Sequence, residues 1–100
     1  MFIRDTRIFE PSDFEWDEAK AASNLKKHGI SFITGALIFF DSGRVEWDVS
    51  RATDLEARYK VVGLVEGRLL TVVFTVRNAR GRIISARPAN TSEERRYGHR

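Results

Sequence analysis

The sequence contains no cysteine, and its 100 residues include only two histidines, two prolines and one methionine. The lack of cysteine excludes a disulfide framework, a thiolate zinc site and a cysteine nucleophile. Two histidines, His28 and His99, are too few for a histidine-rich metal site. The longest apolar tract, residues 33–40, is shorter than the ~18–20 residues of a membrane helix. The N-terminal residues carry charges at the positions where a signal peptide has its apolar stretch. We therefore expect a cytoplasmic protein that needs no metal, no cofactor and no membrane.

The composition is that of one small folded domain. Hydrophobic residues make up 42% of the chain, aromatic residues 11% and charged residues 31%, which is too apolar for a disordered segment. The balance of 17 Lys and Arg against 14 Asp and Glu gives a net charge of +3. This mildly basic balance is compatible with a nucleic-acid partner but does not prove one. We expect a single domain over residues 14–98, preceded by an N-terminal extension over residues 1–13.

Hydrophobic periodicity and capping residues predict the elements of the first half. Asp17 is placed to cap a helix and Gly29 to end it in the left-handed conformation. Ser31 can cap a second helix, which is apolar nearly all round and therefore expected to be buried. The predicted elements are a short strand over 14–16, helices over 18–28 and 32–40, and an edge strand over 45–49.

Three further strands are predicted over 58–65, 68–77 and 82–87. Glu66-Gly67 is a two-residue hairpin loop that pairs Val65 with Arg68. A three-residue loop, Ala79-Arg80-Gly81, would let Ile84 share the core face with Phe74. A capping box formed by Thr91 and Glu94 opens a short last helix over 92–97. The fold class is therefore α+β, with N-terminal helices packed on a mostly antiparallel sheet and a short C-terminal helix.

This register brings three arginines together on one sheet face, with Ser85 across from Thr75 and Lys60 nearby: Arg58, Arg77 and Arg87. A guanidinium keeps its charge and presents a planar fork suited to phosphate oxygens. The sequence therefore predicts a phosphate site that requires no metal. The alternative is a solvated face where the arginines pair with nearby acidic residues.

Five side chains on the predicted helices could extend or serve this face: Lys20, Lys27, His28, Glu94 and Tyr97. His28 could transfer a proton, as histidine side chains often do in enzymes. Tyr97 could stack on a base. The alternatives are that Lys27 and His28 only complement the helix dipole, and that Glu94 caps and Tyr97 packs.

Two segments resemble the BrnT family, toxins of bacterial type II toxin–antitoxin systems. FEWDEAKAASNLKKHGISF, residues 14–32, is similar to the family's opening, and RIISARPANTSEERRYG, residues 82–98, is similar to its closing motif. The resemblance covers residues 14–98. Arg58 and Arg77 fall in the more weakly patterned middle, and the other matching positions are Trp16, Asp17, Lys20, Asn24, Lys27, His28, Gly29, Arg87 and Tyr97.

The resemblance implies a fold similar to the RelE-like ribonuclease toxins and an activity that cleaves RNA and blocks translation. It also implies a BrnA-type antitoxin with a ribbon-helix-helix DNA-binding region. A dimer of such a partner suggests a two-plus-two complex that binds operator DNA through the antitoxin.

The residue types suggest how a metal-independent endoribonuclease would work. The 2′-hydroxyl attacks the adjacent phosphate, and the enzyme stabilises a dianionic transition state and moves two protons. We assign Arg58, Arg77 and Arg87 to the phosphate and His28 to proton transfer, with Glu94 and Tyr97 as further candidates. The RNA-binding candidates are Lys20, Lys27 and Lys60. The alternative function is a non-catalytic RNA-binding module or an operon co-repressor that acts through a DNA-binding partner.

Overall fold

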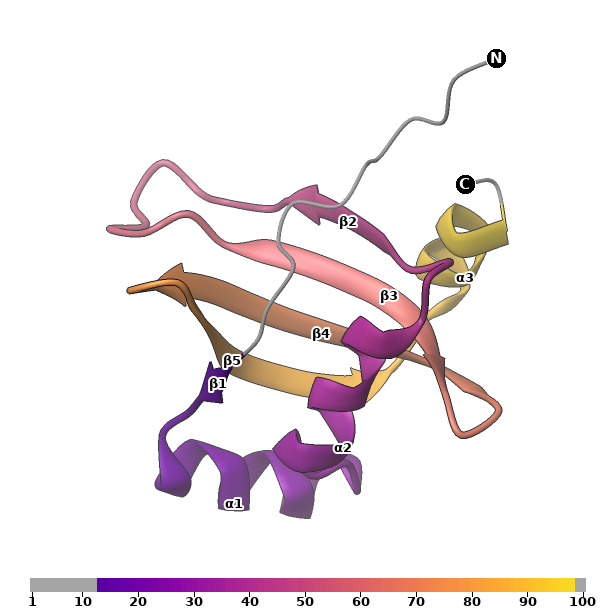
Figure 1. Cartoon of the computed structure of the whole chain (residues 1–100), viewed down its shortest axis with the longest axis horizontal. Helices are drawn as coiled ribbons and strands as arrows, with labels where there is room; N and C mark the ends of the chain where they lie inside the picture. The colour runs from indigo at the N-terminus through magenta and orange to yellow at the C-terminus, as the bar shows by residue number, and fades with distance from the viewer. Residues whose placement is uncertain (1–12, 99–100) are drawn as a thin grey trace.

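The computed structural model describes residues 13–98, so the predicted extension over 1–13 lies outside it except for Asp13. A five-stranded sheet has the order β1-β5-β4-β3-β2, and only the β1–β5 pair is parallel. This is the predicted α+β fold class (Figure 1). The elements are β1 (Phe14–Glu15), α1 (Glu18–His28), α2 (Phe32–Ala36), the 3-10 helix η1 (Leu37–Phe40), β2 (Val45–Asp48), β3 (Tyr59–Val65), β4 (Arg68–Arg77), β5 (Arg80–Pro88) and α3 (Thr91–Gly98).

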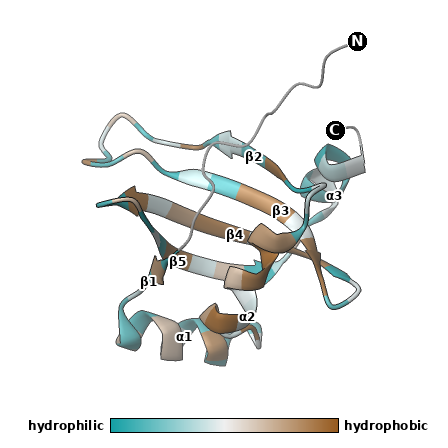
Figure 2. Cartoon of the chain, viewed as in Figure 1, coloured by the Kyte–Doolittle hydropathy of each residue, from teal (hydrophilic) through white to brown (hydrophobic). Residues whose placement is uncertain are grey.

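The hydrophobic core lies between one face of the sheet and the helices α1, α2 and η1. Figure 2 shows the apolar stretches of β3 and β4 beside the apolar α2 segment. Val61, Leu70, Val72 and Phe74 are fully buried on this face. The ring of Phe39 packs edge-on against that of Phe74, with centroids 5.1 Å apart. Within residues 13–98, no helix is long and apolar enough to cross a membrane.

The predicted limits of the first helix are confirmed, and so are its caps. The Asp17 side chain accepts a hydrogen bond from the Lys20 backbone N–H at 2.9 Å. Gly29 has a φ of +73°, and its N–H donates to the Leu25 carbonyl at 2.8 Å. A residue with a β-carbon would be strained at this φ, which is why glycine ends the helix here.

The second helix begins where predicted but changes character before it ends. Ser31 accepts a hydrogen bond from Thr34 N–H at 3.0 Å and so caps α2. After Ala36 the chain tightens into η1, as helix ends often do. The expectation of burial all round was wrong, because the sheet covers only one side of this segment. Ile33 and Phe40 point away from it, with exposed fractions of 68% and 83%.

The first predicted hairpin is confirmed. Glu66 and Gly67 both have positive φ, 51° and 83°, and Val65 pairs with Arg68. These are the angles of the two-residue turn that matches strand twist. Lys60 therefore lies opposite Val73, as predicted.

The second predicted hairpin was wrong in both its loop and its register. Asn78 and Ala79 form a two-residue turn with φ of 51° and 65°, and Arg77 pairs with Arg80. A bulge then shifts the register between Val73 and Phe74 of β4. Because two residues of β5 oppose one of β4 there, Ile83 rather than Ile84 enters the core beside Phe74.

This register also moves two residues of the predicted phosphate face. Ser85 pairs with Val73 rather than Thr75, and Arg87 pairs with Thr71 rather than Val73. Arg82 is the residue that lies opposite Thr75.

The last helix is capped one residue earlier than predicted. Asn90 Oδ1 accepts from Glu93 N–H, and Glu93 Oε1 accepts from Asn90 N–H, both at 2.9 Å. This reciprocal pair is a capping box built on Asn90 and Glu93 rather than on Thr91 and Glu94. Glu93 takes the position because its carboxylate also meets Arg87 and Lys60 of the sheet.

Candidate active site

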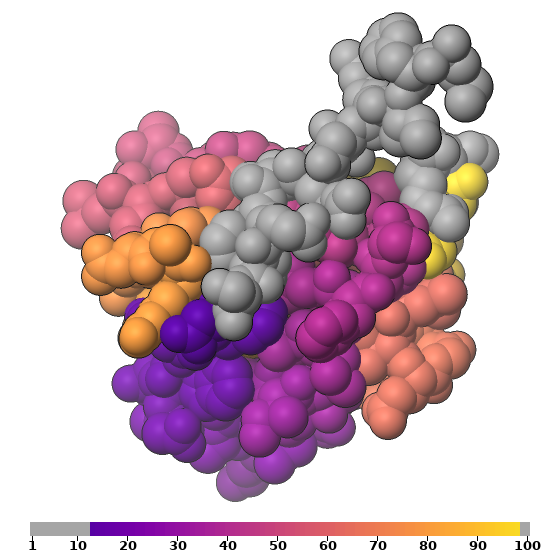
Figure 3. Space-filling model, in the orientation of Figure 1, coloured from indigo at the N-terminus to yellow at the C-terminus, as the bar shows by residue number. Residues whose placement is uncertain are grey.

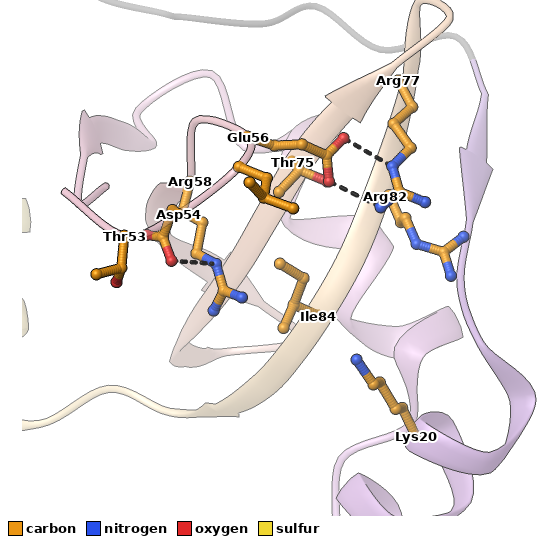
Figure 4. A pocket seen from close by; sticks show the side chains of 10 residues that line it. Lys20, Thr53, Asp54, Glu56, Arg58, Thr75, Arg77, Arg82 and Ile84 are labelled. Atoms are coloured by element: carbon orange, nitrogen blue, oxygen red, sulfur yellow. Dashed lines mark hydrogen bonds and ion pairs between the residues drawn. The ribbon is translucent and has the colours of Figure 1, made fainter. Parts of the chain in front are cut away.

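A pocket of about 320 Å³ opens on the polar face of the sheet, away from the core. Figure 4 shows its residues converging from separate parts of the chain: the start of α1, the connection between β2 and β3, and the ends of β4 and β5. Its lining consists of Lys20, Thr53, Asp54, Leu55, Glu56, Arg58, Thr75, Arg77, Arg82 and Ile84. Four of these ten side chains are cationic and two are carboxylates, so the pocket is polar and carries a positive balance.

The sheet register places the floor of this pocket. Thr75 and Arg82 are directly paired across β4 and β5. Arg77 lies two residues beyond Thr75 and therefore on the same face of β4. Arg58 precedes β3, and its carbonyl accepts a hydrogen bond from Val49 N–H at 2.8 Å. Antiparallel pairing thus gathers basic side chains that are 24 residues apart in sequence.

Arg77 and Glu56 form a two-pronged ion pair in the pocket wall. Arg77 Nε donates to Glu56 Oε2 at 2.7 Å, and Nη2 donates to Oε1 at 2.8 Å. The hydrogen bonds from Arg77 hold the pKa of the Glu56 carboxyl below its usual value. Glu56 is therefore ionised at neutral pH and occupies one edge of the Arg77 guanidinium.

Asp54 and Arg58 make a looser contact on the other side. Arg58 Nε lies 3.6 Å from Asp54 Oδ1. Asp54 is tied into its own loop, because its other oxygen accepts from the Arg51 backbone N–H at 2.7 Å. That backbone hydrogen bond, with the Arg51 and Arg58 charges, lowers the pKa of Asp54. Asp54 therefore shapes the loop, whereas the Arg58 guanidinium keeps most of its donors for another partner.

The remaining cations come from β5 and α1. Arg82 Nη1 donates to Glu15 Oε2 of β1 at 2.8 Å, which orients its guanidinium beside the pocket. Lys20 is exposed on the first turn of α1, and Figure 4 shows its ammonium pointing toward the pocket.

The floor of the pocket holds a buried hydroxyl. Thr75 is only 3% exposed, and within residues 13–98 its Oγ1 has no hydrogen-bond partner. A buried polar group usually finds a partner, and the exceptions tend to lie at functional sites. A hydroxyl beside three guanidinium groups is suited to donate to an anionic oxygen.

The predicted convergence of three arginines is only partly reproduced, because Arg87 belongs to a second cluster. Arg87 lies opposite Thr71, which is four residues and about 13 Å along β4 from Thr75. Both nitrogens of its fork bind Glu93, at 2.8 Å each. Lys60 Nζ and the Thr71 hydroxyl bind the same carboxylate, at 2.9 and 2.8 Å.

Glu93 is the centre of this second cluster. It is 3% exposed, and burial alone would raise its pKa. The hydrogen bonds from Arg87, Asn90 N–H, Lys60 and Thr71 outweigh burial and hold the pKa far below its usual value. The charges of Arg87 and Lys60 are therefore largely committed to fixing α3 against the sheet.

A family model described as the ribonuclease toxin, BrnT, of type II toxin–antitoxin systems matches residues 16–93. The chain belongs to the BrnT family. It is thus a ribonuclease toxin of a type II system, with RNA as its target and an antitoxin protein as its partner. A search of curated proteins finds no match to the chain.

The BrnT motif on α1 serves two different purposes in this structure. Lys20 at its start lines the pocket, whereas Lys27 and His28 lie at the opposite end of the helix, outside the lining. Eight residues of helix separate Lys20 from His28, or about 12 Å. Asn24, between them, is 7% exposed and anchors the helix: its Nδ2 donates to the Ile30 and Ala86 carbonyls at 2.9 and 2.8 Å.

The closing BrnT motif likewise places its candidates away from the pocket lining. Tyr97 Oη donates to Asp41 Oδ2 at 2.8 Å, and Glu94 is exposed on α3. Sequence reasoning instead missed Arg82 and Glu56. Recognising a two-residue turn at Asn78 would have predicted the pairing of Arg82 with Thr75. Glu56 lies in a polar connection that has no sequence pattern to indicate its position.

Proposed function

We propose that this BrnT toxin cleaves RNA in the pocket that contains Arg58, Arg77 and Arg82, without a metal. The 2′-oxygen attacks the adjacent phosphorus, the bond to the 5′-oxygen breaks, and the products carry a 2′,3′-cyclic phosphate and a 5′-hydroxyl. The observation that carries the proposal is the gathering of four cationic side chains around one pocket with a buried, unpartnered hydroxyl on its floor.

The charge arrangement suits a transition state with two negative charges. Preorganised donors stabilise such charge because they need no reorganisation when it develops. Arg77 uses two of its five N–H donors on Glu56, so it can bind a phosphate oxygen without losing that ion pair. Arg58, Arg82 and the Thr75 hydroxyl supply the remaining donors from other sides of the pocket.

We assign the role of general base to Glu56. Its side chain is 36% exposed, compared with 6% for Asp54, so it is the more accessible carboxylate of the pocket. It would take the proton of the attacking 2′-hydroxyl, and a proton from Lys20 or from solvent would go to the departing 5′-oxygen. Glu56 takes this role in place of His28, Glu94 and Tyr97 because those three do not line the pocket.

On the family resemblance, we further propose how the toxin acts and is controlled in the cell. Cleavage would stop growth by blocking translation in the cytoplasm. Neutralisation would come from a BrnA-type antitoxin with a ribbon-helix-helix region, in a two-plus-two complex that binds operator DNA. Lys27, exposed on α1, remains our candidate for contact with the RNA backbone outside the pocket.

The test is RNA cleavage by the purified toxin in excess EDTA, with the product ends mapped. Arg82→Ala is expected to reduce the rate by about 10²–10³-fold, the scale of losing one preorganised donor. Glu56→Gln should lower the maximal rate with little change in KM. Arg68→Ala, an exposed arginine on the β3–β4 hairpin, is the matched control and should cleave normally.

Three outcomes would contradict the proposal. Loss of wild-type cleavage in EDTA would refute metal independence. Equal activity of Arg82→Ala and Arg68→Ala would place the chemistry elsewhere. RNA binding without cleavage, weakened by Arg82→Ala and by salt, would favour the non-catalytic RNA-binding module or co-repressor.

A further inference from the structure

A strip of exposed apolar side chains runs over the helical side of the molecule. We call it the apolar strip, and its members are Leu25, Ile33, Leu37, Phe40 and Leu64, which are 49%, 68%, 40%, 83% and 45% exposed. Ile33, Leu37 and Phe40 follow one another at spacings of four and three residues along α2 and η1. This spacing puts them on one side of the helical segment.

The apolar strip is continuous because three adjoining hollows share its residues. One hollow of about 270 Å³ includes Leu25 and Ile33, and a second of about 330 Å³ includes Ile33, Leu37 and Phe40. A third, of about 270 Å³, includes Leu37, Phe40 and Leu64. In Figure 3 the α2–η1 surface (magenta) lies between β1 and α1 (indigo to violet) and the β3–β4 hairpin (salmon). A single exposed leucine is ordinary, but a contiguous apolar patch of this kind marks an interaction surface.

The charged residues that line the three hollows of the apolar strip are acidic. Four carboxylate residues line the three hollows, and within residues 13–98 no lysine or arginine lines them, although the chain has 17 such residues. The four are Asp13, Glu18, Asp41 and Glu66. Two of them have side-chain partners nearby: Glu18 accepts a hydrogen bond from Trp16 Nε1 at 3.1 Å, and Asp13 forms an ion pair with Arg80 at 3.0 Å. An acidic rim on a basic protein favours a partner segment that carries positive charge.

The apolar strip and the RNA pocket lie on different sides of the sheet. The helices α2 and η1 cover the core face, whereas Thr75 and Arg82 open onto the opposite face. Among the elements of residues 13–98, only α1 contributes to both surfaces, with Lys20 in the pocket and Leu25 in the strip. A segment bound to the strip therefore does not need to enter the pocket.

We propose that the apolar strip is the docking site for an amphipathic helix of the antitoxin, one whose large apolar side chains are flanked by lysine or arginine. The proposal rests on membership of a type II system, which supplies an antitoxin protein as partner. Helix-in-groove binding suits the strip, because apolar positions spaced at i, i+4 and i+7 mesh with a similar row on a second helix.

The first experiment compares hydrogen exchange in the free toxin and in its complex with the antitoxin. We expect slower exchange over residues 33–40 and 64–66 in the complex, and unchanged exchange over the pocket connection, residues 51–58. Protection of 51–58 alone would overturn the proposal, because the antitoxin would then occupy the RNA pocket instead.

The second experiment measures antitoxin affinity for substituted toxins. Ile33→Ser and Phe40→Ser should each weaken binding by about tenfold or more, as loss of a buried interface anchor does. Leu55→Ser is the matched control for antitoxin affinity: Leu55 is fully exposed, at 103%, and lines the pocket rather than the strip, so its removal should leave antitoxin binding unchanged. Glu66→Lys should weaken binding more at low than at high salt, because the flanking charges would then repel.

Measurements of oligomeric state, hydrogen exchange and antitoxin affinity would also detect a different occupant of the apolar strip. A free toxin that dimerises, and becomes monomeric with Phe40→Ser, would overturn the proposal in favour of a second copy of this chain. Faster exchange over 33–40 in the free toxin after deletion of residues 1–12, with antitoxin affinity unaffected by Phe40→Ser, would assign the strip to the chain's own N-terminal segment. RNA cleavage by isolated Phe40→Ser toxin is expected to be normal, so failure here is distinguishable from failure of the ribonuclease proposal.

Discussion

Arg87→Ala should destabilise the toxin strongly, because it removes the main partner of a buried carboxylate. Glu93 has a side chain only 4% exposed, and Arg87, at 28%, supplies two of its hydrogen bonds. Removing one partner of a buried ion pair costs about 3–5 kcal/mol, since the other charge is left desolvated. Lys60 still contacts Glu93 at 2.9 Å, so we expect the lower end, about 3 kcal/mol.

The assay is urea unfolding at pH 7, with Arg77→Ala as the control. Arg77 makes the same two-pronged contact to Glu56, but these side chains are 47% and 36% exposed. An exposed pair contributes only about 0–1 kcal/mol, so Arg77→Ala should unfold almost like the wild type. Equal losses in the two variants would refute the reasoning. A folded Arg87→Ala toxin without activity would instead restore the catalytic role that the sequence suggested for Arg87.

Three further predictions concern stability. Asn24→Ala should lower the free energy of unfolding by about 2–3 kcal/mol in urea, because Ile30 and Ala86 lose hydrogen bonds inside the fold. Ala79→Gly should raise the midpoint of thermal unfolding by an amount equivalent to about 1 kcal/mol. The reason is that the β-carbon of alanine is strained at a φ of +65°, whereas glycine is not. The lowered pKa of Glu93 stabilises the fold above its unfolded pKa, and this contribution is lost as pH falls through the folded pKa. Below about pH 4 the wild type should therefore lose stability with falling pH more steeply than Glu93→Gln, followed by circular dichroism; parallel pH profiles would contradict this.

The sequence predicted α1, its caps and the first hairpin because each depends on local chemistry. Asp17 and Gly29 occupy positions whose backbone needs suit those residue types. Gly67 likewise marks a turn in which both central residues have positive φ. In these places the local signal and the final structure agree, so a single sequence is sufficient.

The second hairpin could not be read in the same way, because two conflicting signals stand side by side. Gly81 looks like the left-handed residue of a loop, yet it pairs with Val76 inside the sheet, and Ala79 takes the positive φ. A bulge further along β5 returns the later residues of this strand to the predicted faces of the sheet, and no residue type in the sequence indicates this bulge. The predicted register would put Arg82 on the same side as Ile84 in the core, which is why the pocket's β5 arginine was missed.

The site was predictable only as far as the sheet register allowed. Arg58 and Arg77 do meet around the pocket, because they depend on the first hairpin. Arg87 separates from them because the second hairpin and its bulge place it opposite Thr71, where Glu93, rather than Glu94, binds its guanidinium. Two adjacent glutamates after Asn90 and Thr91 fit the same capping pattern, and only tertiary contacts decide between them.

The parallel pairing of β1 with β5 determines when the proposed cleavage pocket can form during synthesis of the chain. Phe14 and Glu15 of β1 pair with Gly81 and Arg82, and the pocket needs Arg82 next to Thr75. Strand pairings this distant in sequence cannot form before the later strand has been made. A growing chain that has not yet reached β5 lacks both the edge that anchors β1 and one wall of the pocket. The proposed cleavage pocket is therefore complete only after nearly all of the described domain has been translated.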